Sequence, residues 1–400
     1  MNVKPTSYNF SAVHAAMRRY TTSNILSGVS HAVLQGRDLI DVGYSGWANR
    51  EKNITLDETH LFRIASNTKL ITSIAVLMLI EDGLLSLSDP IESYISQLGN
   101  RQVLQSGATD LSNTEPAKSP ITIAHLLSHS SGLSYGLLDP GSPMFRAYNS
   151  VKVLNAKQPL SVLINVLENL PLSFHPGTAW EYSIATDVLG YLIEVVSGKP
   201  LDAFFAERIF TPLGMNDTFF FVPPDKQPRL AAYYRGADRL DVMKPGLSRI
   251  DTSPHNMPYM NAFLQPMPRL SGGGGLVSSL PDMVALIRSL MPGDDALLKP
   301  HSMALMMGNQ LASGVNIGFP PLGKIPGKVY SVAGSLTQEP LSRDPAGSKG
   351  ELQWGGIYGT HWWISPNANL AGILMTQREM GFWHPFSFDF KNEVYAAVGA

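Results

Sequence analysis

The chain contains a serine and a lysine at a spacing that can activate the serine as a nucleophile. The segment 66–69 reads Ser-x-x-Lys, and an almost wholly apolar run over 70–80 follows it. That run is too long for one strand and stops shortly before Gly83, which predicts a buried helix with Ser66 and Lys69 in its first turn. Residues three apart share a helix face, so the Lys69 amine can reach the Ser66 hydroxyl. Burial favours a neutral amine, and the positive end of the helix dipole favours an oxyanion near Ser66.

A second polar side chain that could take part in this chemistry lies before another apolar segment. Tyr182 precedes a run with helical spacing of apolar residues, which begins near Ile184 and ends at Ser197-Gly198. A phenol at the start of a buried helix would be held in a fixed position. The Ser-x-x-Lys pattern alone is weak, because two fixed positions recur by chance about once in a chain of this length. Without partners, Ser66 could equally be a helix cap and Lys69 a solvated first-turn residue.

The elements that must position these residues are strands at both ends of the chain with helices between them. We expect an amphipathic helix over about 10–22, a hairpin formed by 29–34 and 39–44, and a strand over 61–64 that leads to Ser66. Near the C-terminus we expect strands over 329–336, 352–357, 362–364 and 370–376, and a final helix over about 386–398. This order predicts an α/β (α+β) protein whose central sheet is closed by both termini.

The middle of the chain has a different composition. Residues 135–158 resemble a flap, 160–170 a helix, and 222–270 an irregular excursion that forms walls of a cleft. The glycines at 272–275 lack the Lys-Ser/Thr of a phosphate-binding loop, so they indicate close backbone packing beside the cleft. We therefore expect a single domain of two lobes, with an α/β lobe from 1–92 and 271–400 and a helical, irregular lobe over 93–270.

Composition excludes several classes of function. The net charge of -2 gives no basic patch for nucleic acid, and the absence of cysteine excludes disulfides and thiol catalysis. No apolar run reaches the roughly 18 residues of a membrane span, and residues 1–20 lack the apolar core of a signal peptide. We expect a soluble, cytoplasmic protein whose partner is a small molecule. A signal removed before this sequence begins would leave the same pattern, and the oligomeric state is not readable.

His125 and His129 are four residues apart and could face one metal ion. The third ligand of a His-Glu-x-x-His motif is missing. We interpret both as hydrogen-bonded structural histidines and expect neither a metal nor a cofactor.

Taken together, these motifs resemble the serine β-lactamase and penicillin-binding-protein superfamily, for which Ser-x-x-Lys is a known signature. Within it the chain is most similar to the family VIII carboxylesterases, which resemble class C β-lactamases. The resemblance covers nearly the whole chain and rests on the segments 61–69, 125–133, Tyr182-Ser183, 212–215, 272–276 and 352–359. It implies a β-lactamase/transpeptidase-like fold, with a central antiparallel sheet flanked by helices and an inserted, mainly helical lobe.

The resemblance also implies roles for particular residues. Ser66 would attack an ester carbonyl, and Lys69 and Tyr182 would act as a coupled base. The backbone N–H groups of Ser66 and Ile357 would hold the oxyanion. Gly355 and Gly356 would allow the substrate to approach the late strand closely, and Trp354 and Tyr135 would form walls of the pocket. Either aromatic residue could instead be ordinary core.

Two departures from class C β-lactamases bear on the substrate. The Asn of Tyr-x-Asn is replaced by Ile184, and the Lys of Lys-Thr-Gly is replaced by Trp354. Both changes remove partners for a β-lactam and favour neutral, short- to medium-chain acyl esters. No Gly-x-Ser-x-Gly motif occurs, so the nucleophile elbow of α/β-hydrolases is excluded. The remaining alternatives are a β-lactamase or DD-peptidase, an acyltransferase that uses an alcohol acceptor, and a sensor that is acylated only once.

Overall fold

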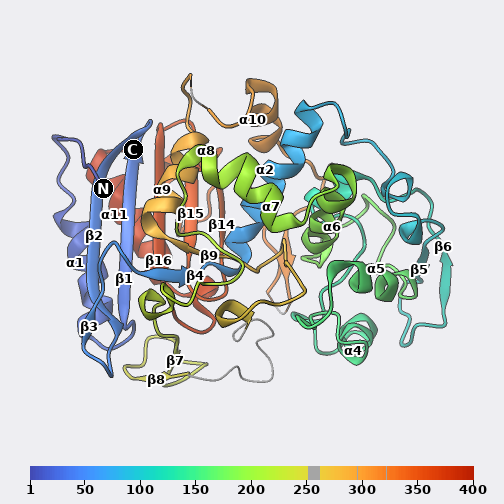
Figure 1. Cartoon of the computed structure of the whole chain (residues 1–400), viewed down its shortest axis with the longest axis horizontal. Coiled ribbons are helices and arrows are strands. Elements are labelled where there is room, and N and C mark those ends of the chain that lie inside the picture. The colour runs from blue at the N-terminus through green and yellow to red at the C-terminus, as the bar shows by residue number, and fades with distance from the viewer. Residues whose placement is uncertain (251–261, 295, 321) are drawn as a thin grey trace.

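The fold is organised around one eight-stranded antiparallel sheet. The computed structural model describes residues 1–250, 262–294, 296–320 and 322–400. The strand order in the sheet is β12-β13-β14-β15-β16-β1-β2-β3. Its strands are β1 (Gly28–Gln35), β2 (Asp38–Asn49), β3 (Ile54–Thr55), β12 (Lys328–Tyr330), β13 (Ser335–Thr337), β14 (Leu352–Gly355), β15 (His361–Ser365) and β16 (Leu370–Thr376). Because β1 pairs with β16, the two ends of the chain meet in the sheet, as predicted (Figure 1).

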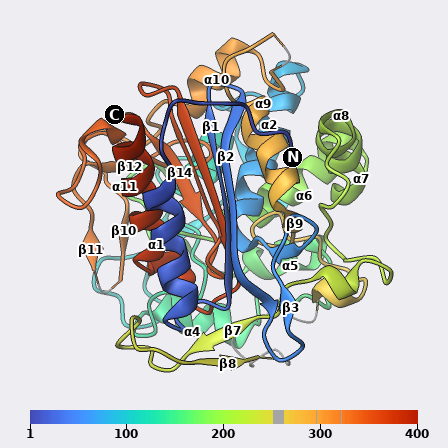
Figure 2. The same ribbon diagram turned by 90° about the vertical axis from the view of Figure 1, so that its left-hand side faces the viewer.

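Helices cover both faces of this sheet (Figure 2). Helices α1 (Ser11–Thr22) and α11 (Phe386–Val398) pack on one face, and α2 (Thr68–Glu81) and α9 (Leu280–Ser289) pack on the other. Side chains along β1 point alternately to the two faces of the sheet. Val29 and Val33 belong to the core under α1, while Ala32 and Leu34 belong to the core under α2. The mixed α/β class and the antiparallel sheet flanked by helices are confirmed.

Helix α2 is the element that leads away from Ser66. Every residue from Thr68 to Leu79 is buried, and the helix ends at Glu81, two residues before Gly83 with its φ of +73°. Ser66 itself lies outside α2, in a 3₁₀ turn over Ala65–Asn67, so the prediction that it opens the α-helix was wrong by one short turn. Lys69 lies in the first turn of α2, three residues after Ser66, and this spacing keeps the two side chains on one side of the segment.

The other helices lie between the two halves of the sheet in sequence. They are α3 (Ile123–Leu127), α4 (Pro143–Ser150), α5 (Leu160–Glu168), α6 (Ala185–Ser197), α7 (Leu201–Phe205), α8 (Thr211–Leu213) and α10 (Pro300–Met306). Four further antiparallel pairs join β4 (Leu61–Arg63) to β9 (Val277–Ser279), β5 (Gln102–Leu104) to β6 (Thr114–Pro116), β7 (Tyr234–Gly236) to β8 (Leu247–Arg249), and β10 (Gly318–Phe319) to β11 (Gly323–Lys324). In Figure 1, α4, α5 and α6 gather on the side of α2 away from α1. The division into two lobes stays a prediction, and part of the 222–270 excursion, residues 251–261, lies outside the described residues.

One predicted strand is in fact two. Residues 329–336 were expected to form a single strand, but β12 and β13 form a hairpin there. The Ser331 hydroxyl accepts hydrogen bonds from the N–H groups of Ala333 and Gly334, at 3.0 and 3.3 Å. This local turn interrupts what would otherwise be a continuous strand.

Across the described residues, no helix combines the length and the apolar character that crossing a bilayer requires.

Candidate active site

Ser66 is held at a strained junction between β4 and α2. Ala65, just before it, has a φ of +44°, an uncommon conformation for a residue with a side chain. The flanking backbone is fixed by other segments, because Ile64 donates its N–H to the Leu276 carbonyl at 3.0 Å and Thr360 donates its hydroxyl to the Ile64 carbonyl at 3.0 Å. Strain of this kind persists only where the surroundings enforce it, and such positions cluster at functional sites.

Three predicted site residues come together around the Ser66 hydroxyl. Tyr182 donates its hydroxyl to Ser66 Oγ at 2.7 Å, and Lys69 Nζ lies 3.5 Å from the same oxygen. The Lys69 ammonium position is also 4.7 Å from the centre of the Tyr182 ring. Tyr182 comes from the segment just before α6, and Lys69 comes from the first turn of α2. A serine with a phenol and an amine this close has two groups that can exchange its proton.

Lys69 is held in place by the glycine segment 272–275. Its Nζ donates to the Gly273 carbonyl at 2.5 Å, and only 2% of the residue is exposed. A side chain on Gly273 would come within 2.6 Å of Asp187 Oδ2, so glycine is required for this approach. The interpretation of 272–275 as close backbone packing beside the cleft agrees with this geometry. Asp187 was missed by sequence reasoning: it is fully buried on α6, and among the described residues its Oδ2 has no hydrogen-bond partner.

Ser66 opens into a cavity of about 530 Å³. Predicted residues that line it are Tyr182, Tyr135, Trp354, Gly355 and Ile357. The Tyr182 ring is 5.5 Å from the Tyr135 ring and 5.4 Å from the Trp354 ring, so both aromatic residues lie beside Tyr182. Most of the lining is apolar, which suits the acyl or alcohol group of a neutral ester.

The two glycines after Trp354 both allow close contacts within the protein. A side chain on Gly356 would lie 2.4 Å from the Ile64 carbonyl, and one on Gly355 would lie 2.5 Å from His361 Nδ1. Both glycines therefore let protein segments pack together, and Gly356 does not line the cavity. Gly355 also lines the cavity, whereas any effect of Gly356 on a substrate is indirect.

The two candidate histidines are structural, as expected. His125 Nδ1 accepts the Thr122 N–H at 3.1 Å while Thr122 Oγ1 accepts the His125 N–H at 3.2 Å, which caps α3. His129 Nδ1 accepts the Ser183 N–H at 3.2 Å, and its ring lies 4.9 Å from the Tyr182 ring. Burial and the nearby Lys69 charge hold the pKa of His129 well below its usual value, so it stays neutral while supporting Tyr182 from behind.

Four aromatic residues of the cavity wall were not predicted. They are Phe319, Tyr358, Phe382 and Trp383, and the Phe319 ring lies 4.7 Å from the Trp383 ring. The adjacent Phe382-Trp383 pair in a late loop was the available sequence signal. Two arginines that line the same cavity form ion pairs with Glu379. Arg235 Nε lies 2.5 Å from Glu379 Oε2, and Arg239 Nη2 lies 2.9 Å from Glu379 Oε1.

Comparison with known proteins places this site in a family. The Beta-lactamase family matches residues 13–384, and the chain belongs to that family. It is similar to an uncharacterized protein of Mycobacterium tuberculosis (34% identical; 92% of this chain and 90% of the relative). It is also similar to the esterase EstB of Burkholderia gladioli (28%; 99% of each) and to the lovastatin esterase of Penicillium rubens (34%; 78% and 77%). Among solved structures, EstCE1, a hydrolase with promiscuous acyltransferase activity, matches with a TM-score of 0.81, 25% identity and coverage of 96% of this chain and 97% of that one.

These findings confirm the resemblance drawn from the sequence. The chain is a serine hydrolase of the esterase class, within the family VIII branch of the β-lactamase-like superfamily.

Proposed function

We propose that the protein is a carboxylesterase that hydrolyses short- to medium-chain acyl esters through an acyl-enzyme on Ser66. The observation that carries this proposal is the 2.7 Å contact between Tyr182 Oη and Ser66 Oγ, with Lys69 Nζ 3.5 Å away. The esterase names of similar proteins support the reaction class. The aromatic walls of the 530 Å³ cavity support a neutral, apolar acyl group.

The reaction runs in two halves on the same groups. Ser66 Oγ bonds to the ester carbonyl carbon while its proton passes to the Tyr182–Lys69 pair, and the carbonyl oxygen becomes an oxyanion held by the N–H groups of Ser66 and Ile357. The bond to the alcohol oxygen then breaks, and the pair returns the proton to that oxygen. In the second half, water attacks the Ser66 ester, the pair takes a proton from the water, and Ser66 Oγ leaves with that proton.

A β-lactamase or DD-peptidase activity has less support. Trp354 borders the cavity where a cation would be needed to pair with a β-lactam carboxylate, and burying that carboxylate unpaired is costly. Ile184, in place of the amide residue, is fully buried and does not line the cavity, so it offers no polar partner either.

Acyl transfer to an alcohol is the second candidate. It is favoured by the similarity to EstCE1, whose description includes promiscuous acyltransferase activity, and by a cavity with room for an acceptor. Adding a co-alcohol during ester turnover and measuring the transester product would separate the two activities. Product formed in proportion to acceptor concentration would support transfer, and hydrolysis alone would leave esterase as the function.

The acyl-enzyme is tested by labelling and by a substrate series. A serine-directed phosphonate should add one equivalent of mass, and peptide mapping should place the adduct on Ser66. Nitrophenyl esters of increasing chain length should be cleaved best at short to medium length and not at all by Ser66→Ala. An adduct on another residue, or a burst that stops after one turnover, contradicts the proposal, and the second outcome would indicate a sensor.

A further inference from the structure

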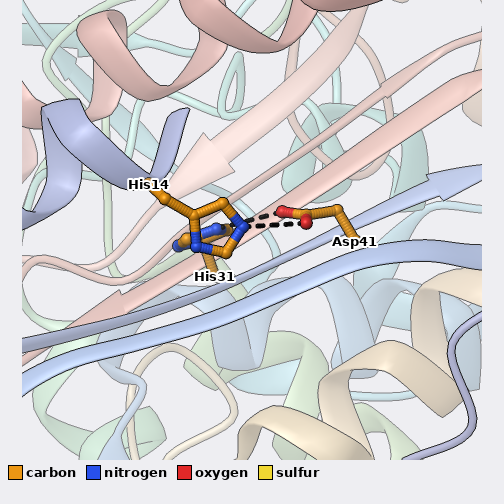
Figure 3. Close-up of side chains that lie close together, drawn as sticks. All are labelled: His14, His31 and Asp41. Atoms are coloured by element: carbon orange, nitrogen blue, oxygen red, sulfur yellow. Dashed lines mark hydrogen bonds and ion pairs between the residues drawn. The ribbon is translucent and has the colours of Figure 1, made fainter. Parts of the chain in front are cut away.

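Three side chains that no motif connects meet on the far side of the sheet from Ser66. His14 lies on α1, His31 on β1 and Asp41 on β2, and Figure 3 shows both imidazole rings turned toward the carboxylate. The distance from His14 Nε2 to Asp41 Oδ1 is 2.9 Å, and that from His31 Nε2 to Asp41 Oδ2 is 3.2 Å. In the part of the chain that the structure describes, this is the one group of three such residues close enough to share a metal ion.

The backbone beneath the cluster leaves space for both rings. Gly43 is the direct strand partner of His31. A side chain at Gly43 would lie 2.3 Å from His31 Cε1 and 2.9 Å from His14 Cε1. The two imidazoles therefore occupy the place of a missing side chain, and any other residue at this position would push them away from Asp41.

Exposure increases across the cluster from the interior to the surface. The side chain of His31 is 1% exposed, that of Asp41 is 12% exposed and that of His14 is 35% exposed. The His31 ring is also packed against Phe390 of α11, at 5.4 Å. The inner ligands are thus fixed by packing, while an ion and its remaining water can enter from the His14 side.

We propose that His14, His31 and Asp41 form a binding site for Zn²⁺ or a similar divalent transition-metal ion. A tetrahedral zinc with bonds of about 2.0–2.1 Å separates its ligand atoms by roughly 3.3 Å. His14 Nε2 and His31 Nε2 contact different oxygens of Asp41, at 2.9 and 3.2 Å, and the three residues offer ligand atoms within 4.8 Å of one another, so small side-chain rotations would bring two nitrogens and one oxygen around a shared ion. Two imidazoles and a carboxylate are ligands that zinc accepts, and water would take the fourth position.

The affinity should be moderate. Ligating histidines usually donate their second ring N–H to an acceptor, and losing such a partner weakens binding by about 10–100-fold. His31 Nδ1 is buried and has no hydrogen-bond partner among the described residues. We therefore expect binding about 10–100-fold weaker than at a site where both histidines have such partners. The bound ion would join α1 to the β1–β2 hairpin, so binding should raise the unfolding temperature and leave the Ser66 site, on the opposite face, unchanged.

The test uses the full chain after chelation and dialysis. Calorimetric titration with Zn²⁺ should give one site, and Co²⁺ should produce the visible absorption of a four-coordinate site. His14→Gln is the main variant, because His14 is partly exposed and its replacement leaves the core intact; Asp41→Asn is the second. His175→Gln is the matched control, since His175 pairs with Glu115 at 2.8 Å but belongs to no three-residue group in the described chain.

Each result decides the proposal. It is supported if the wild type and His175→Gln bind one equivalent and gain the same thermal shift, while folded His14→Gln and Asp41→Asn bind at least about tenfold more weakly. It is overturned if the wild type binds no Zn²⁺ in the titration, or if both ligand variants bind as tightly as the control, because the ion would then lie elsewhere.

Discussion

Removing the Tyr182 hydroxyl is the sharpest test of the site, because Tyr182→Phe deletes one oxygen and keeps the ring. The ring contacts remain: its centre is 4.9 Å from His129, 5.5 Å from Tyr135 and 5.4 Å from Trp354. What disappears is the 2.7 Å hydrogen bond to Ser66 Oγ. In the ground state such a bond contributes about 1 kcal/mol, so the folded protein should lose little stability.

The kinetic effect should be much larger than the effect on stability. General acid–base catalysis contributes roughly 10²- to 10⁴-fold to a rate. The remaining amine, 3.5 Å from Ser66 Oγ, is beyond the distance of a good hydrogen bond. We therefore expect kcat/KM for nitrophenyl acetate to fall by about 10²- to 10⁴-fold, with the loss mainly in kcat because the cavity walls are intact.

Tyr330→Phe is the matched control. Tyr330 is buried, and its ring lies 5.2 Å from His129 and 5.1 Å from Trp354, so it belongs to the same aromatic cluster but makes no contact with Ser66. Its variant should keep kcat/KM within a few-fold. If Tyr182→Phe retains more than a tenth of wild-type kcat/KM while folded, or if both variants lose activity equally, the assignment of Tyr182 to proton transfer is refuted.

Three other predictions concern specificity and pH. Trp354→Lys should raise the ratio of nitrocefin to short-ester turnover, even if both rates fall, because a cation would meet the β-lactam carboxylate; an unchanged ratio in a folded variant would show that the indole does not exclude β-lactams. The rate should rise from acid pH to a neutral or mildly alkaline plateau, and His129→Gln should leave the acid limb in place, since the low pKa of His129 keeps it neutral there; a displaced limb would implicate the histidine in the chemistry. Burial lowers the pKa of His384 to about 4 from 6.5, and its Nδ1 already accepts the Phe386 N–H. The unfolded chain therefore binds more protons between these values, and stability should be full above about pH 6.5 and fall by about 3 kcal/mol toward pH 4. Denaturant titrations across this range should show a shallower fall for His384→Gln, and parallel curves would contradict the assignment.

Some elements of this protein are determined by short stretches of sequence. The apolar run over 70–80 forms α2, and the final helix has the predicted bounds, Phe386–Val398. The Ser-x-x-Lys spacing also brings Lys69 within 3.5 Å of Ser66, since both lie on consecutive turns of one segment. These features depend on interactions between residues a few positions apart, which periodicity and spacing report directly.

Other features depend on contacts between distant segments. Gly355 packs against His361 and Gly356 packs against Ile64, and no local pattern revealed either contact. The cavity wall acquires Phe319 from β10 and Trp383 from a 3₁₀ turn over Gly381–Trp383, both far from Ser66 in sequence.

The candidate active site contains features of both kinds, some determined by local sequence and some by contacts between distant segments. The sequence by itself determined the spacing of Ser66 and Lys69 and the helix that follows them, because these form one continuous segment. Only the tertiary structure decided that the Tyr182 hydroxyl, 116 residues away, is hydrogen-bonded to Ser66, and that the Gly273 carbonyl accepts a hydrogen bond from Lys69. It also decided that His14, His31 and Asp41 lie close together beside Gly43. The first two contacts depend on the packing of α2 beside α6, and the third depends on the packing of α1 against the sheet, so each is set by contacts between segments far apart in sequence.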